Sequence, residues 1–153
     1  MAVTLAQLIQ KGGIFNDVEG SSAKEVYRKI VDRLELPESI PSDDVYKALC
    51  DREDLMSTAV GNCIAIPHCR VPLLKNEEDQ KVCVVRLKNP IDMSAPDGLS
   101  VSVMFIILAQ NLKDHLKVLS DLGNVIKAPK FRKLLAEGAE ESQLLDLIRE
   151  LSK

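Results

Sequence analysis

The most apolar stretch of the chain, Leu99 to Leu108, places the strongest constraint on the fold. It consists of aliphatic, β-branched and aromatic side chains, interrupted only by two serines. Apolar runs of this length are typical of strands that are covered on both faces of a sheet. The overlapping run from Val101 to Ala109 is much shorter than the roughly 18 apolar residues that cross a bilayer as a helix. The stretch therefore predicts a strand at the centre of a sheet.

Other strand patterns alternate with segments whose apolar residues recur at helical spacing. Strands are predicted at 14–18, 63–66, 82–87 and 99–108. Helices are predicted at 5–12, 23–34, 42–52, 112–126, 129–135 and 140–151. A loop is expected at 71–80 and a turn at Ala95-Pro96-Asp97-Gly98, and the strand at 82–87 is expected to end at Asn89-Pro90.

This order of helix, strand, two helices, two or three strands and three helices predicts an α/β fold with helices on both faces of a small sheet. The spacing of the strands at 82–87 and 100–108 is compatible with an antiparallel pair. The chain shows no internal repeat and no long linker, so a single domain is expected over residues 1–153.

Composition excludes several classes of function. The net charge is −3 and charges of both signs are interspersed, which argues against a broad nucleic-acid surface. No signal-peptide pattern and no membrane-spanning run occur, so a cytoplasmic protein is expected. Free thiols are then the default for the four cysteines, Cys50, Cys63, Cys69 and Cys83.

The segment from Arg52 to Arg70 contains the residues best suited to chemistry. His68 follows the apolar residues 63–66 and Pro67, so its imidazole is expected at the mouth of the sheet. Between Arg52 and His68 lie Ser57, Thr58 and Gly61. A ring nitrogen, a guanidinium and hydroxyls near a glycine turn are suitable parts for handling a phosphoryl group.

Each of these residues also has an ordinary structural explanation. An exposed histidine is commonly plain surface, and an arginine near a helix C-terminus interacts favourably with the helix dipole. Hydroxyls in a loop commonly stabilise that loop. His115 borders an apolar helix face, where a hydrogen-bonded, partly buried histidine is common.

Several motifs resemble those of the enzyme IIA domains of the phosphoenolpyruvate:sugar phosphotransferase system, in the fructose/mannitol class and most closely its nitrogen-regulatory branch. They are Arg52-Glu53, Ser57-Thr58, Gly61-Asn62, Ile64-Ala65-Ile66-Pro67-His68, Asn89-Pro90-Ile91-Asp92, Pro96-Asp97-Gly98 and His115-Leu116. The resemblance spans nearly the whole chain. It implies the mannitol/fructose-type fold, a three-layer α/β/α domain with a small mixed β-sheet.

The resemblance also implies roles for individual residues. His68 would accept the phosphoryl group at Nε2, with Nδ1 held by a hydrogen bond. His115 would lie beside it and orient the group, and Arg52 would supply positive charge. Phosphate oxygens could accept hydrogen bonds from Ser57, Thr58 or backbone N–H groups near Gly61.

The function implied is that of a phosphotransferase component. An HPr-like phosphocarrier protein would phosphorylate His68, and the group would pass to an enzyme IIB or act as a regulatory signal. Three alternatives stay open: a partner-binding module for a kinase or transporter, switched by phosphorylation of His68; a dedicated fructose or mannitol transport component; and a regulatory domain without phosphotransfer. No cofactor is expected, and contact with a membrane is expected only through transporter partners.

Two departures from the family pattern concern the site. Thr58-Ala59-Val60-Gly61 stands where the family has Thr-Gly-Ile-Gly, so Ala59 would be strained if that position requires a positive φ. Cys69-Arg70 follows the histidine, and Arg70 adds charge to the site or faces solvent. A metal site built from Cys63, His68, Cys69 and Cys83 is the weaker hypothesis, since Cys63 is expected on a strand that points into the core.

Overall fold

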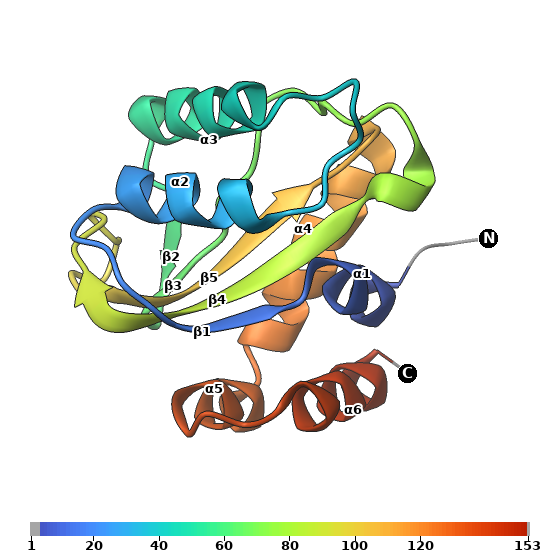
Figure 1. The fold of residues 1–153 in the computed structure, drawn as a ribbon. Coiled ribbons are helices and arrows are strands. Elements are labelled where there is room, and N and C mark those ends of the chain that lie inside the picture. The colour runs from blue at the N-terminus through green and yellow to red at the C-terminus, as the bar shows by residue number, and fades with distance from the viewer. Residues whose placement is uncertain (1–3, 153) are drawn as a thin grey trace.

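A five-stranded mixed sheet forms the middle layer of the protein (Figure 1), in the strand order β1-β4-β5-β3-β2. The computed structural model describes residues 4–152. The strands are β1 (Ile14–Val18), β2 (Ala59–Gly61), β3 (Ile64–Ala65), β4 (Lys81–Ile91) and β5 (Val101–Leu108). The helices are α1 (Leu5–Gly12), α2 (Ala23–Arg33), α3 (Ser42–Leu55), α4 (Leu112–Ile126), α5 (Pro129–Ala136) and α6 (Glu141–Leu151), with a short 3₁₀ turn at Glu77–Asp79.

Helices cover both faces of the sheet. Figure 1 shows α2 and α3 on one side and α1, α4, α5 and α6 on the other. The two helical layers enclose two separate apolar cores, one on each face of the sheet. The predicted three-layer α/β/α fold with a small mixed sheet is thus confirmed.

The apolar strand β5 lies third of the five strands, as predicted from its composition. It pairs antiparallel with β4 and parallel with β3. Because successive side chains of a strand point to opposite faces, Phe105 and Ile107 enter the core under α4, and Met104 and Ile106 enter the core under α2 and α3. β5 therefore contributes to both cores at once.

Side-chain caps define the starts of several helices. Thr4 and Gln7 form a capping box at α1, and the hydroxyl of Ser22 accepts the Glu25 N–H at the start of α2. Asn111 caps α4 in the same way. The predicted starts of α1 and α2 are confirmed.

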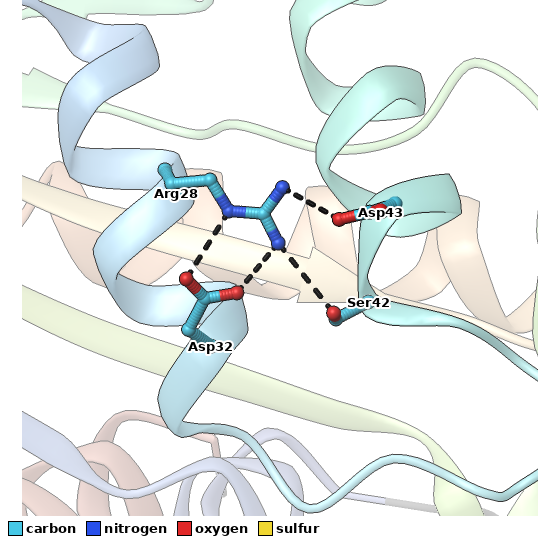
Figure 2. A network of polar contacts seen from close by, with 4 residues as sticks. All are labelled: Arg28, Asp32, Ser42 and Asp43. Carbon is cyan, nitrogen blue, oxygen red and sulfur yellow. Dashed lines mark hydrogen bonds and ion pairs between the residues drawn. The ribbon is translucent and has the colours of Figure 1, made fainter.

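Helix α3 is tied to α2 by Arg28. Figure 2 shows its guanidinium between Asp32 on its own helix and Ser42 and Asp43 at the start of α3. The Nη1–Oδ1 distance to Asp43 is 2.9 Å, and the guanidinium carbon lies 4.5 Å from the ring centre of Tyr46. These contacts fix the orientation of α3, whose last turn carries Arg52.

The strand predicted at 63–66 is wrong in detail. Residues 59–65 form a hairpin of two very short antiparallel strands, β2 and β3, which the apolar pattern did not reveal. Cys63 lies in the turn of this hairpin with φ +66°, so it is not on a strand. Contrary to the expectation, it does not point into the core. Asn62 has a positive φ as well. Two adjacent positive φ values are typical of the tightest hairpin turns.

The expectation that a strand ends at Asn89-Pro90 is also wrong. β4 continues through both residues to Ile91, and its pairing with β5 shifts register between Arg86 and Ile91. A proline is tolerated in a strand where the ladder is irregular, because its missing N–H costs no regular hydrogen bond there. Within residues 4–152, no helix is both long and apolar enough to span a membrane.

Candidate functional site

The segment after β3 places His68 beside the C-terminal end of β5. The N–H of Ile107 donates to the carbonyl of Pro67 at 2.9 Å, and His68 itself bridges to Ile107 in parallel register. Pro67 therefore interrupts the regular strand without releasing the chain from the edge of β5. The imidazole is half-buried at this end of the sheet.

One nitrogen of the His68 ring is occupied by the protein. Nδ1 lies 2.8 Å from the carbonyl oxygen of Ile66. A carbonyl oxygen only accepts, so Nδ1 carries the proton of the neutral ring and Nε2 keeps its lone pair. The backbone group that fixes the tautomer is thus identified as Ile66.

His115 lies next to His68. It is in the first turns of α4, which follows β5 after a short connection, and its side chain is buried. The two ring centres are 5.0 Å apart and the planes are inclined by 52°. The structure therefore brings together two histidines that are 47 positions apart in the sequence (115 minus 68).

Both histidines favour the neutral state. Burial lowers the pKa of His68, the hydrogen bond to Ile66 opposes this effect, and the charges of Arg52 and Glu53 act in opposite directions. Burial also lowers the pKa of His115, with a further contribution from His68. A neutral imidazole with a free Nε2 is the nucleophilic form.

Arg52 lies in the last turn of α3, as its place in the sequence predicts. Its Nη1 donates to the carbonyl of Met56 at 2.6 Å, which closes the end of the helix. No acidic side chain within residues 4–152 forms an ion pair with it. Its charge still lowers the pKa of His68, so it acts on the same site.

The hydroxyls between Arg52 and His68 are engaged with the protein. Ser57 donates to the carbonyl of Met93, and Thr58 donates to Glu53 at 2.7 Å. Binding of phosphate by either hydroxyl would require it to exchange its partner. Gly61 has φ +98° in the β2–β3 hairpin, beside the carboxylate of Asp97. Roles for these three residues in phosphate binding stay predictions.

The departure at Ala59 causes no backbone strain. Ala59 lies in β2, pairs with Ala65 and does not adopt a positive φ. Arg70 is exposed. Burial raises the pKa of Cys69 to about 12 and that of Cys83 to about 12, so both are thiols near neutral pH. Among residues 4–152, no three metal-ligating side chains are grouped so that they could bind an ion.

The hydrogen bonds of Glu53 could not be predicted from the sequence, which presents this residue only as part of the Arg-Glu motif. Glu53 accepts three hydrogen bonds beside Arg52. An apolar rim around His68 is expected, because in-line transfer requires the two histidines of donor and acceptor to approach closely. The segments that carry the polar residues do carry exposed apolar side chains, although no apolar period predicts which residues these are. These are Leu55 and Met56 at the end of α3, Val71 after His68, and Leu112 and Leu116 on α4.

Comparison with known proteins gives consistent matches over almost the full length. The family model described as "Phosphoenolpyruvate-dependent sugar phosphotransferase system, EIIA 2" matches residues 7–151. A nitrogen regulatory protein of Pseudomonas aeruginosa is 30% identical over 150 residues, which cover 95% of each chain.

Solved structures agree with these matches. The crystal structure of the nitrogen regulatory protein IIA-Ntr from Neisseria meningitidis superimposes with a TM-score of 0.81 at 30% identity, covering 94% of this chain and 97% of that one. The mannitol enzyme IIA of Escherichia coli, solved in complex with phosphorylated enzyme IIB, gives a TM-score of 0.66 at 18% identity, covering 91% and 95%. The second likeness is one of fold alone.

Proposed function

Because the chain belongs to the EIIA 2 family of the phosphoenolpyruvate-dependent sugar phosphotransferase system, we propose that it is a phosphocarrier that accepts a phosphoryl group on Nε2 of His68. One observation carries the assignment to this atom. Nδ1 is occupied by the carbonyl of Ile66, so Nε2 of the half-buried ring is the nitrogen left for reaction.

The transfer exchanges one P–N bond for another. The Nε2 lone pair attacks phosphorus in line, while the P–N bond of a donor phosphohistidine breaks and its electron pair returns to the donor ring. The proton on Nδ1 stays in place during this step. The positive charge that the His68 ring gains is stabilised by the carbonyl of Ile66.

Two neighbours are suited to the incoming charge, since a phosphoryl group brings roughly two negative charges at pH 7. Arg52 has no carboxylate partner within residues 4–152, so its guanidinium is available to phosphate oxygens. His115, with its ring centre 5.0 Å from that of His68, orients the group or donates to it.

The donor in this proposal is an HPr-like phosphocarrier protein. The exposed apolar side chains of Met56, Val71, Leu112 and Leu116 suit a docking surface around the two histidines, because such contacts let two proteins approach closely without burying charge. The acceptor is an enzyme IIB, as in the mannitol complex of Escherichia coli, or a regulated partner.

The regulatory role is favoured over sugar transport by the relatives. Both the Pseudomonas protein and the Neisseria structure, each 30% identical to this chain, are named nitrogen regulatory proteins. In a regulatory role, a kinase or transporter would bind only one phosphorylation state of His68. Pull-down with the phosphorylated and unphosphorylated forms, set against the rate of transfer to purified enzyme IIB, separates the two roles.

The direct test is incubation with phosphoenolpyruvate, enzyme I and HPr, followed by intact mass spectrometry. We expect a gain of one phosphoryl group that is lost in acid and absent in His68→Ala. The matched control is Asp54→Asn, which removes an exposed charge on α3 and should be phosphorylated normally. A phosphoryl group that persists in His68→Ala, or no gain in the wild type, would disprove the proposal.

A further inference from the structure

The carboxylate of Glu53 accepts hydrogen bonds from three donors. Oε1 accepts from the hydroxyl of Tyr27 at 2.6 Å and from the hydroxyl of Thr58 at 2.7 Å. Oε2 accepts from the backbone N–H of Thr58 at 2.8 Å. Tyr27 is fully buried and Thr58 is almost so. Hydrogen bonds to an ionised carboxylate in such surroundings are stronger than those between neutral groups.

These bonds connect three parts of the molecule. Glu53 is in the last turns of α3, Tyr27 is in the middle of α2, and Thr58 directly precedes β2. Burial raises the pKa of Tyr27, so its hydroxyl stays a donor. Loss of the carboxylate would leave that buried hydroxyl without its acceptor. Glu53 thus fixes the end of α3 against the start of the hairpin that leads to His68.

The connection continues from Thr58 to the reactive ring. The carbonyl of Thr58 accepts the N–H of Ile66 at 2.9 Å, and the carbonyl of Ile66 lies 2.8 Å from Nδ1 of His68. A chain of hydrogen bonds therefore runs from Glu53 through Thr58 and Ile66 to His68. A shift of Thr58 would move the group that selects the tautomer of His68.

The carboxylate of Glu53 binds Tyr27 and Thr58 and forms no ion pair with Arg52. The two residues are adjacent in the sequence, yet all three donors to the carboxylate come from Tyr27 and Thr58. The guanidinium of Arg52 donates to the carbonyl of Met56, a neutral group. Its positive charge is therefore not cancelled by a directly bound carboxylate.

We propose that Glu53 is a positioning residue for phosphoryl transfer, which acts through Thr58 and Ile66 on His68 and leaves Arg52 free for the phosphoryl group. This inference rests on the proposed phosphocarrier function. It assigns to the second residue of the Arg-Glu motif a task distinct from that of the first, since Glu53 itself contacts neither the phosphoryl group nor the donor.

The test compares Glu53→Gln and Tyr27→Phe with Asp54→Asn. Asp54 is the next residue on α3 and forms an exposed ion pair with Lys24, so its substitution removes the same charge without touching the hydrogen-bond chain. With enzyme I, HPr and phosphoenolpyruvate, we expect Glu53→Gln to slow phosphorylation of His68 by about tenfold to a hundredfold. Tyr27→Phe should slow it less, and Asp54→Asn should leave it within about twofold of the wild type.

Titration of His68 by NMR distinguishes a positioning role of Glu53 from a general loosening of the site in the Glu53→Gln variant. The ring is affected by Arg52 and Glu53 from α3 and lies against His115 from α4. Loss of the Glu53 charge lowers the pKa of His68, whereas loosening of the site would hydrate the ring and raise it. We expect the pKa to fall in Glu53→Gln and to stay unchanged in Asp54→Asn.

The outcomes are distinct. If the wild type is phosphorylated on His68 but Glu53→Gln reacts as fast as Asp54→Asn, or its His68 pKa rises, the positioning role is wrong and the phosphocarrier function stands. If the wild type accepts no phosphoryl group, both fall together. Should Glu53→Gln not fold, a Tyr27→Phe rate equal to that of the wild type overturns the positioning role.

Discussion

At the scale of single residues, the charge balance around His68 predicts the pH dependence of phosphorylation. Burial lowers the pKa of His68 from the ordinary value near 6.5, so the ring stays neutral and nucleophilic to lower pH than a free histidine. Arg52 contributes to this lowering. The rate of phosphoryl acceptance should therefore be level near pH 7 and fall only at more acidic pH.

Arg52→Gln tests this prediction. Loss of the guanidinium raises the pKa of His68, so the acid limb of the rate profile should move to higher pH, and the plateau rate should fall by about tenfold or more because phosphate oxygens lose a cation. Arg70→Gln is the control, since Arg70 is exposed and has no such effect on His68. The test is to measure the rate of phosphorylation of both variants between about pH 5 and 8. An acid limb that moves to lower pH in Arg52→Gln would contradict the effect of Arg52 on the pKa of His68.

Sequence motifs were sufficient to select the candidate residues of the site but not their partners. Residue types and position point to His68 and Arg52, and the family resemblance adds the roles of these two residues and of His115. The engagement of Ser57 depends on the carbonyl of Met93, which a strand and its irregular end bring close from 36 positions away. Such long-range contacts leave no local pattern in the sequence.

At the scale of elements, substitution of two helical glycines by alanine is expected to change the free energy of unfolding in opposite directions. Gly12 in α1 lies directly against β4, and a Cβ at this position would come within 2.1 Å of the carbonyl oxygen of Val82. Gly12→Ala forces the helix away from the sheet and should lower the free energy of unfolding by about 1–3 kcal/mol or more. A Cβ on Gly123 in α4 would have no neighbouring atom within 4 Å, so Gly123→Ala should raise the free energy of unfolding by about 0.5–1 kcal/mol.

Urea denaturation of the two variants beside the wild type measures both effects. Each substitution adds one methyl group to a helix, so the comparison isolates the contact with β4 from helix propensity. Equal shifts of the two variants in the same direction would show that α1 does not pack against β4 as closely as the structure indicates.

Helices were easier to predict than the short strands. The period of α4 and the caps at Thr4 and Ser22 are local signals, and their helices begin where expected. β3 has two residues and gains its pairing from β5, almost forty positions later. Tertiary pairing rather than local propensity makes such a segment a strand.

At the scale of the whole molecule, the order of helices and strands in the sequence predicts the class of fold. It does not predict the order of the strands within the sheet. The antiparallel β4–β5 pair is local in the sequence and was anticipated. The parallel pairs β1–β4 and β3–β5 join distant segments and could come only from the family resemblance. Together these pairings place the end of β3 beside the start of α4, and so create the pair of histidines.

The same pair of histidines predicts how stability changes with pH. The folded protein lowers the pKa of His68 and of His115, mainly by burial. Unfolding returns both to values near 6.5, so the unfolded chain binds more protons below that pH. Their contribution to stability is complete above about pH 6.5 and is lost as the pH falls. The free energy of unfolding should therefore decrease from about pH 7 to about pH 5.

Urea unfolding at a series of pH values measures the effect, and His115→Gln should make the decrease shallower. The carboxylates of Asp97 and Asp114 do not interfere, because hydrogen bonds lower their pKa values and their contribution is lost only at more acidic pH, below about 4. A free energy of unfolding that rises from pH 7 to pH 5 would mean that the histidines gain protons on folding. The neutral, nucleophilic His68 that the phosphocarrier function requires would then not be the form present near neutral pH.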